Sequence, residues 1–220
     1  CIVYLAIVLN YKINSEEELK NIINSPILGH IVRNEAKEEM VSFKNSRSLI
    51  SESFRSIRTN LQFVINKGLG NTMLITSSTM GEGKSFISYN LAACFAKNNE
   101  NSIILQFDLR KDNYIGLNTD QKHLGLSEYL SKNVAYEHIV FPLYDNLSII
   151  YSLNIPPNPT ELISSERTNE LIDRLKKEYK NIIIDTSPVG VVSDALLLCR
   201  HIDAMLFVVR NNYTRKKQLA

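Results

Sequence analysis

The sequence predicts an α/β fold, in which helices cover both faces of a mostly parallel central sheet to form a three-layer sandwich. After Gly70, short apolar runs alternate with segments of helical periodicity. The apolar runs are continuous, as expected of parallel strands that are buried on both faces. Hydrophobic residues make up 44% of the 220-residue chain, which is enough apolar material for such a core.

The expected strands and helices follow one another in regular alternation. Apolar runs predict strands at 72–77, 102–107, 147–152, 181–187 and 204–210. Helical patterns are found at 48–66, 84–96, 125–130, 168–180 and 193–201. A helix between successive strands is the connection that a parallel sheet requires.

Two of these helices differ in how their apolar residues are placed. The first carries apolar residues at steps of three and four, namely Ile50, Phe54, Ile57, Leu61 and Val64. The second, residues 84–96, is apolar nearly all round. We therefore expect the first to cover the sheet with one face and the second to be buried.

Charge and cysteine content exclude several classes of protein. The net charge of +2 is nearly neutral, so the sequence gives no electrostatic reason to expect a nucleic-acid partner. Cys1, Cys94 and Cys199 have neither the spacing of a disulfide framework nor that of a zinc site. A reducing compartment is expected.

The part before residue 48 has a different character. The apolar residues 1–11 are expected to be the end of a transmembrane helix, with a buried edge strand as the alternative. Residues 12–47 are polar and mixed, and we expect a juxtamembrane linker with a helix cap at Asn14 or Ser15. Residues 48–220 then form the folded domain, which we expect to be truncated at its C-terminus.

The stretch "SSTMGEGKSF", residues 77–86, nearly spells the P-loop pattern G-x-x-x-x-G-K-[ST], with Ser78 in place of the first glycine. It follows an expected strand and opens an expected helix, which is the context a P-loop needs. Such a loop binds phosphates with its backbone N–H groups. The ATP-binding residues are therefore predicted to be Thr79, Met80, Gly81, Glu82, Gly83, Lys84, Ser85 and Phe86.

Two acidic residues follow apolar strands. "IIIDTSP" places Asp185 at the end of one strand, and "ILQFDLRKD" places Asp108 after another. The carboxyl ends of parallel strands are where ligands bind in such folds. Lys84, Asp108 and Asp185 are therefore the predicted catalytic residues, and Ser85, Asp108 and Asp185 the predicted Mg²⁺ ligands. Arg110 is expected either to neutralise phosphate or to pair with an acidic neighbour.

Taken together, these residues resemble the cytoplasmic kinase domain of the bacterial tyrosine kinases (BY-kinases) of capsule and exopolysaccharide export. "STMGEGKS", "QFDLR" and "IIIDTSP" stand in the order of that family's Walker A, A′ and B motifs. "SPILGHI", "PPNPTELISS" and "SDALLL" resemble further stretches of the family. Its E-x-x-R-x-x-R helix, which assembles a ring of subunits, is matched by Glu52, Arg55 and Arg58; spacing alone would make these residues a solvated helix face.

The resemblance implies a P-loop NTPase-type fold and an ATP-dependent tyrosine autokinase that uses Mg²⁺. It also implies a homo-oligomeric ring with phosphorylation in trans, a polysaccharide polymerisation and export machinery as partner, and an opposing tyrosine phosphatase. The domain would lie on the cytoplasmic face of the bacterial inner membrane.

The sequence departs from the family pattern in three ways, and two other functions stay open. The segment before "PPNP" reads "SLNI", where a glycine is usual. Gln106 replaces the first aspartate of D-x-D-x-R, although its amide oxygen could still be a weak metal ligand. The ten tyrosines are dispersed and form no C-terminal cluster. A MinD/ParA-type ATPase is the nearest alternative, but it would carry a lysine at the position of Thr79. A nucleotide-binding scaffold with weak or no catalysis is the other.

Overall fold

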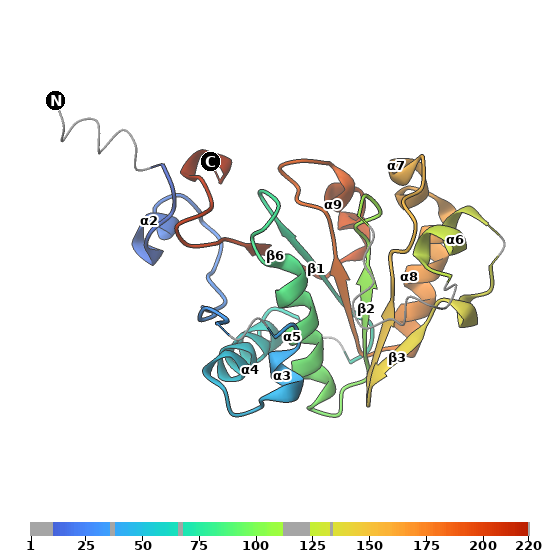
Figure 1. Cartoon of the computed structure of the whole chain (residues 1–220), viewed down its shortest axis with the longest axis horizontal. Coiled ribbons are helices and arrows are strands. Elements are labelled where there is room, and N and C mark those ends of the chain that lie inside the picture. The colour runs from blue at the N-terminus through green and yellow to red at the C-terminus, as the bar shows by residue number, and fades with distance from the viewer. Residues whose placement is uncertain (1–10, 36–37, 66–67, 112–123, 133, 220) are drawn as a thin grey trace.

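The fold is built on one six-stranded sheet in the order β3-β4-β2-β5-β1-β6 (Figure 1). The computed structural model describes residues 11–35, 38–65, 68–111, 124–132 and 134–219. The strands are β1 (Asn71–Ser77), β2 (Ser102–Gln106), β3 (Phe141–Tyr144), β4 (Leu147–Ile150), β5 (Asn181–Asp185) and β6 (Ala204–Val208). Each of the five expected strands is present, and the predicted fold class is confirmed.

β3 is the strand that sequence analysis missed, and it pairs with β4 in antiparallel fashion, whereas every other pairing in the sheet is parallel. It contains Pro142 and is half exposed, so it lacks the continuous apolar run by which the other strands were recognised. A tight turn at Asp145–Asn146 joins the two strands, with Asn146 at a φ of 60°.

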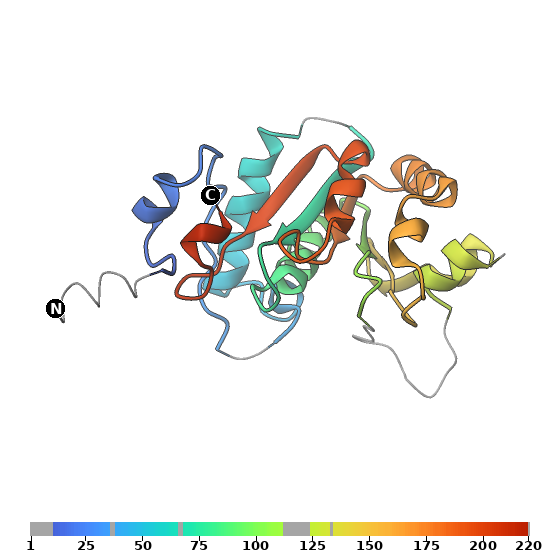
Figure 2. The same cartoon turned by 90° about the horizontal axis from the view of Figure 1, so that it is seen from above.

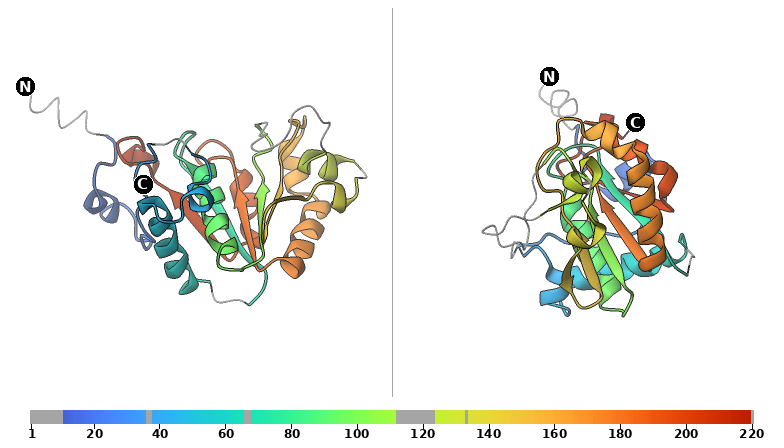
Figure 3. Two further views of the ribbon diagram at one scale, coloured as in Figure 1. Left: turned by 60° about the horizontal axis from the view of Figure 1, so that its bottom comes forward. Right: turned by 90° about the vertical axis from the view of Figure 1, so that its right-hand side faces the viewer.

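The helices form two groups, one on each face of the sheet (Figures 2 and 3). One core joins the sheet to α3 (Val41–Lys44), α4 (Leu49–Gln62) and α5 (Lys84–Ala96). The other joins it to α6 (Leu126–Ser131), α7 (Pro159–Ile163), α8 (Glu166–Glu178) and α9 (Asp194–Leu197). Neighbouring residues of one strand, such as Ile183 and Ile184, contribute to opposite cores.

The helix expected at 48–66 is shorter in the structure. It begins after Ser48, whose side chain caps it by accepting from the Ser51 backbone N–H, and it ends at Gln62. Phe54 is fully buried, but Val64 is 56% exposed, so its expected place in the apolar stripe is wrong. The helix expected at 193–201 is divided into α9 and a short 3₁₀ turn, Cys199–His201.

Part of the expected linker packs against the domain. Ser15 caps α2 (Glu16–Lys20), and Met40 and Val41 belong to the core beneath α4 and α5. The start of the described chain also meets its end, because Lys12 forms a β-bridge with Arg215 (Figure 1). Residues 1–10 lie outside the described part of the chain. Among the residues that the structure describes, no helix is long and apolar enough to cross a membrane.

Candidate active site

The phosphate-binding loop has the predicted strand–loop–helix form. β1 ends at Ser77, and α5 begins at Lys84. Gly81 and Gly83 have φ values of 81° and 98°. Positive φ values of this size are accessible to glycine and strained for residues with a side chain, so the conformation of the loop requires glycine at both positions. The helix N-terminus and the turned loop together have the form that an anion site needs, and phosphate binding at this loop stays a prediction.

Lys84 lies buried at the base of this loop. Its side chain is buried, and its Nζ donates a hydrogen bond to Ser77 Oγ at 3.1 Å. Burial lowers the pKa of Lys84, and the negative charges of Asp185, Asp108 and Glu82 oppose that shift. An ammonium group so poorly solvated interacts strongly with any phosphate that enters.

Asp185 is the last residue of β5 and is almost fully buried. It faces α5, where Ser88 Oγ donates to Asp185 Oδ1 at 3.2 Å and where the Ser85 hydroxyl lies near enough to favour the charged carboxylate. Burial raises the pKa of Asp185 to about 6, although the two serines and Lys84 favour the charged form. Asp185 and Ser85, predicted to act together, therefore lie close to each other.

Asp108 lies two residues beyond the end of β2, and β2 is the strand next to β5 in the sheet. It is partly exposed, and Ser187 Oγ donates to Asp108 Oδ1 at 2.5 Å. Arg110, two residues on, forms a bidentate pair with the buried Asp194 of α9 at 2.8 and 2.9 Å. Of the two roles expected for Arg110, the structure shows the second, which is pairing with an acidic neighbour.

Gln106 is a structural residue rather than a free ligand. It is buried, its Oε1 accepts from the Ser152 backbone N–H at 3.0 Å, and its Nε2 donates to the Tyr89 hydroxyl. The oxygen that was expected to be a weak metal ligand is therefore bound to the neighbouring chain segment. This amide links the end of β2 to α5 and to the segment that follows β4.

The oxygen donors of the site suit Mg²⁺. Ser85 supplies a hydroxyl, and Asp108 and Asp185 supply carboxylates; Mg²⁺ is commonly held by one or two carboxylates together with the phosphates of a nucleotide. Among the described residues, no group of three His, Cys, Asp or Glu side chains is arranged to hold a metal. The hydroxyl and the two carboxylates are a donor set that fits Mg²⁺ held together with nucleotide phosphates.

The remaining ATP-binding candidates divide into exposed and packed residues. Met80, Gly81 and Gly83 are exposed along the loop, and the Phe86 ring instead packs on Phe54 at 5.9 Å between centroids. The side chain of Glu82 turns back into the loop.

Gly190, which sequence analysis did not single out, lies directly under the loop. A Cβ atom at this position would stand 2.2 Å from the Ser78 carbonyl oxygen. The signal for it was the glycine shortly after "IIIDTSP", but one sequence gives no spacing rule that would connect residue 190 with residue 78.

We expect Gly190→Ala to displace the loop, because the new methyl group meets backbone atoms that cannot rotate away. The change should lower the free energy of unfolding by about 1–3 kcal/mol and weaken nucleotide binding. Gly68→Ala is the matched control, since a Cβ there meets nothing within 4 Å. Urea unfolding and calorimetric titration with MgADP measure the two effects. Equal behaviour of the two variants would contradict the expected clash.

The three residues of the expected ring helix lie on α4 and make contacts within the chain. Arg55 Nε donates to Glu52 Oε2 at 3.0 Å, and Arg55 Nη2 donates to the Ser46 carbonyl at 2.9 Å. Arg58 reaches the Cys94 carbonyl at the end of α5, with Nη1 at 3.4 Å. Their role between subunits stays a prediction.

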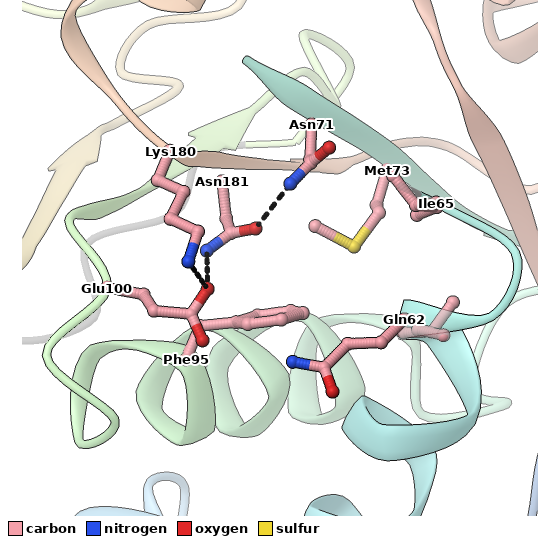
Figure 4. Close-up of a pocket in the computed structure, with 9 residues that line it drawn as sticks. Gln62, Ile65, Asn71, Met73, Phe95, Glu100, Lys180 and Asn181 are labelled. Carbon is pink, nitrogen blue, oxygen red and sulfur yellow. Dashed lines mark hydrogen bonds and ion pairs between the residues drawn. The ribbon is translucent and has the colours of Figure 1, made fainter. Parts of the chain in front are cut away.

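A cavity of about 200 Å³ lies at the other edge of the sheet, where β1 and β5 begin (Figure 4). Its polar side chains bind one another: Glu100 accepts from Lys180 at 3.0 Å and from Asn181 at 3.1 Å, and Asn181 accepts from Asn71 at 3.3 Å. None of the predicted site residues lines it.

Comparison with known proteins agrees with this geometry. Residues 70–213 match a family described as an AAA domain. The tyrosine-protein kinase YwqD of Bacillus subtilis is 33% identical over 84% of this chain and 78% of its own length. The chain belongs to the bacterial tyrosine-protein kinases. It spans about a third of some other members, such as the tyrosine-protein kinase ptk of Acinetobacter johnsonii, which is 28% identical over 94% of this chain and 30% of its own length.

Several solved structures are similar to this chain. The chimerical protein CapA2B2 has a TM-score of 0.84 and 33% identity, with 93% of this chain and 89% of that one covered. The kinase domain of the Escherichia coli tyrosine kinase ETK has a TM-score of 0.76 and 28% identity, over 95% and 80% of the two chains. The cell division ATPase MinD of Pyrococcus furiosus, at 22% identity and a TM-score of 0.52 over 64% and 59%, shares the fold alone.

Proposed function

We propose that this chain transfers the γ-phosphoryl group of ATP to tyrosine hydroxyls. The observation that carries the proposal is the meeting of Lys84, Asp108 and Asp185 at one edge of the sheet, beside a loop and helix N-terminus built for phosphate. The names of the relatives support the same activity, since YwqD and ETK are both described as tyrosine kinases.

The residues would divide the work as follows. Loop N–H groups and Lys84 hold the phosphates and offset their charge, while Ser85, Asp108 and Asp185 hold Mg²⁺, which would neutralise charge that develops on the phosphoryl oxygens. The tyrosine oxygen forms a bond to the γ-phosphorus as the bond to the β–γ bridging oxygen breaks, and ADP leaves. The hydroxyl proton passes to a carboxylate such as that of Asp108, which is partly exposed.

A homo-oligomer with transfer in trans is the second part of the proposal. Glu52, Arg55 and Arg58 stand along one helix and are partly or fully exposed, so a second copy can reach them. We expect Arg55→Ala with Arg58→Ala to shift the chain toward monomer in sedimentation analysis. A matched pair on the far face, Arg167→Ala with Arg174→Ala, serves as control. An unchanged size distribution would remove α4 from the interface.

The biological setting is proposed from the family. A relative from Klebsiella pneumoniae, 30% identical over 82% of this chain and 25% of its own length, is described as a putative tyrosine-protein kinase in cps region. We propose that this chain likewise regulates polysaccharide polymerisation and export, at the cytoplasmic face of the inner membrane, against a tyrosine phosphatase. Deleting the gene and measuring the chain length of surface polysaccharide would test it, and an unchanged length would count against it.

The activity is tested by incubating the chain with γ-labelled ATP, with a Lys84→Met copy of different mass as acceptor. We expect label on tyrosine of the acceptor copy in the presence of Mg²⁺ and none after chelation. Label released only as free phosphate would favour an ATPase of the MinD type. Nucleotide binding without label on tyrosine would favour a scaffold. The specific reason to test for one is Gln106, which replaces a carboxylate and whose amide bonds to Tyr89 and Ser152.

A further inference from the structure

We propose that Glu82 and Thr214 form a brace that holds the P-loop in its phosphate-binding shape, and that Thr214 is therefore a positioning residue for the nucleotide. The proposal rests on the nucleotide binding proposed above. It concerns a turn that follows β6 and that no motif of the sequence identified.

The Glu82 carboxylate is buried within the loop and bound by neutral donors. It is 4% exposed, and it accepts from Ser78 Oγ at 2.9 Å, from the Thr79 backbone N–H at 2.8 Å and from the Thr214 hydroxyl. A negative charge beside a phosphate site opposes anion binding, so a carboxylate here needs a compensating purpose. Its hydrogen bonds supply one, because they tie the start of the loop to its end.

These contacts also explain the serine in place of glycine at position 78. The Ser78 hydroxyl is one of the donors that hold Glu82. A glycine would leave the carboxylate with one fewer partner in a place that water hardly reaches. Ser78 and Glu82 thus work as a pair within the loop.

Thr214 is itself rigidly placed, as a positioning residue must be. It is fully buried, and its Oγ1 accepts from the Arg210 N–H at 2.9 Å. Its own N–H donates to the Arg210 carbonyl at 2.9 Å, and its carbonyl accepts from the Ile13 N–H at 2.9 Å. The hydroxyl hydrogen is left to point at Glu82.

The same turn binds the outward-facing carbonyls of the loop. Arg210 Nη1 donates to the Gly81 carbonyl at 2.6 Å, and the Tyr213 hydroxyl donates to the Met80 carbonyl at 3.0 Å. Loop carbonyls that are bound on the outside leave the N–H groups free to turn inward toward phosphate. The turn at 210–214 therefore stabilises the loop at two carbonyls and at Glu82.

Calorimetric titration of the whole chain with MgADP tests the brace. Thr214→Val keeps the size and branching of the side chain but removes the hydroxyl. A smaller fraction of the molecules then has the P-loop in its phosphate-binding conformation, and the Kd for MgADP should rise about tenfold. Thr214→Ser should stay within about twofold of the wild type because it keeps the donor. Thr168→Val is the matched control, since Thr168 is equally buried, donates to the Leu162 carbonyl at 2.8 Å and lies on α8.

A double-mutant cycle separates positioning from general destabilisation. If Thr214 acts through Glu82, Thr214→Val should add less than about twofold to the Kd of Glu82→Gln. Ser78→Ala replaces Thr214→Val if that variant does not fold, with the same expectation and the same cycle.

The outcomes bear on the brace and on nucleotide binding separately. A wild-type Kd in Thr214→Val, or a full additional loss in the Glu82→Gln background, overturns the brace alone. A wild-type chain that does not bind MgADP overturns the proposed function, and the brace falls with it.

Discussion

Lys84→Met should lower the rate of phosphoryl transfer to tyrosine by at least about a hundredfold. The ammonium group is the buried cation at the base of the loop, and in a poorly solvated site its charge is worth far more than in water. Methionine has nearly the same length and no charge. The protein should therefore keep its fold, since burial of Lys84 already disfavours its charged form. Rates of phosphotyrosine formation under saturating MgATP give the comparison.

The control for this substitution lies on the same helix. Lys97 stands at the other end of α5, is exposed and donates to the Phe43 carbonyl at 2.8 Å. Lys97→Met makes the same chemical change away from the loop and should transfer phosphate at the wild-type rate. A Lys84→Met variant that retains more than about a tenth of the wild-type rate, with its unfolding midpoint unchanged, would remove Lys84 from the mechanism.

Asp185→Asn should stabilise the fold at neutral pH while it lowers transfer more than about a hundredfold. The asparagine keeps an oxygen for Ser88 but cannot offset the charge of Mg²⁺. The gain in stability follows from burial, which raises the pKa of Asp185 from its ordinary 3.8 to about 6. An active-site carboxylate that is held charged in a buried place costs stability, and the neutral amide removes that cost.

The sign of the pH dependence follows from the two pKa values. Below about pH 4 the carboxyl is protonated in both the folded and the unfolded chain, and the asparagine has no advantage. As the pH rises from about 4 to about 6, the unfolded chain ionises this carboxyl while the folded chain keeps it protonated, so wild type loses stability relative to the variant. Above about pH 6 both states are ionised, and the loss levels off on the order of 2–3 kcal/mol. Urea unfolding at several pH values between about 3 and 8 measures this difference. Asp173→Asn, at an exposed position on α8, is the control.

The local features of the site could be predicted because each is encoded in adjacent residues. The boundaries of α5 and the turn at Gly81 and Gly83 agree with the structure, since loop, cap and helix lie within "GEGKSFISYNLAACFA". Asp185 could be placed for the same reason, because a continuous apolar run ends in it. Such patterns are read over a few residues, which is the distance over which helix and strand periodicity acts.

Contacts between distant segments could not be predicted. Nothing in the sequence connects Thr214 with Glu82, or Arg110 with Asp194, because each pair meets only after the sheet has formed. The weak strand β3 was missed because its pairing with β4, not its composition, determines its conformation. The Gln106 oxygen was left open as a weak metal ligand, and its burial against Tyr89 depends on the position of α5.

The central claim is that this site transfers phosphate to tyrosine, and the ratio of phosphotyrosine to ADP tests it most directly. Purified chain, MgATP and a tyrosine-containing polymer would be incubated together, and both products would be quantified from the same sample. We predict a ratio near one for the wild type, and a fall in the amounts of both products in Lys84→Met and Asp185→Asn. ADP that accumulates with an equal amount of free phosphate and without phosphotyrosine would contradict the account.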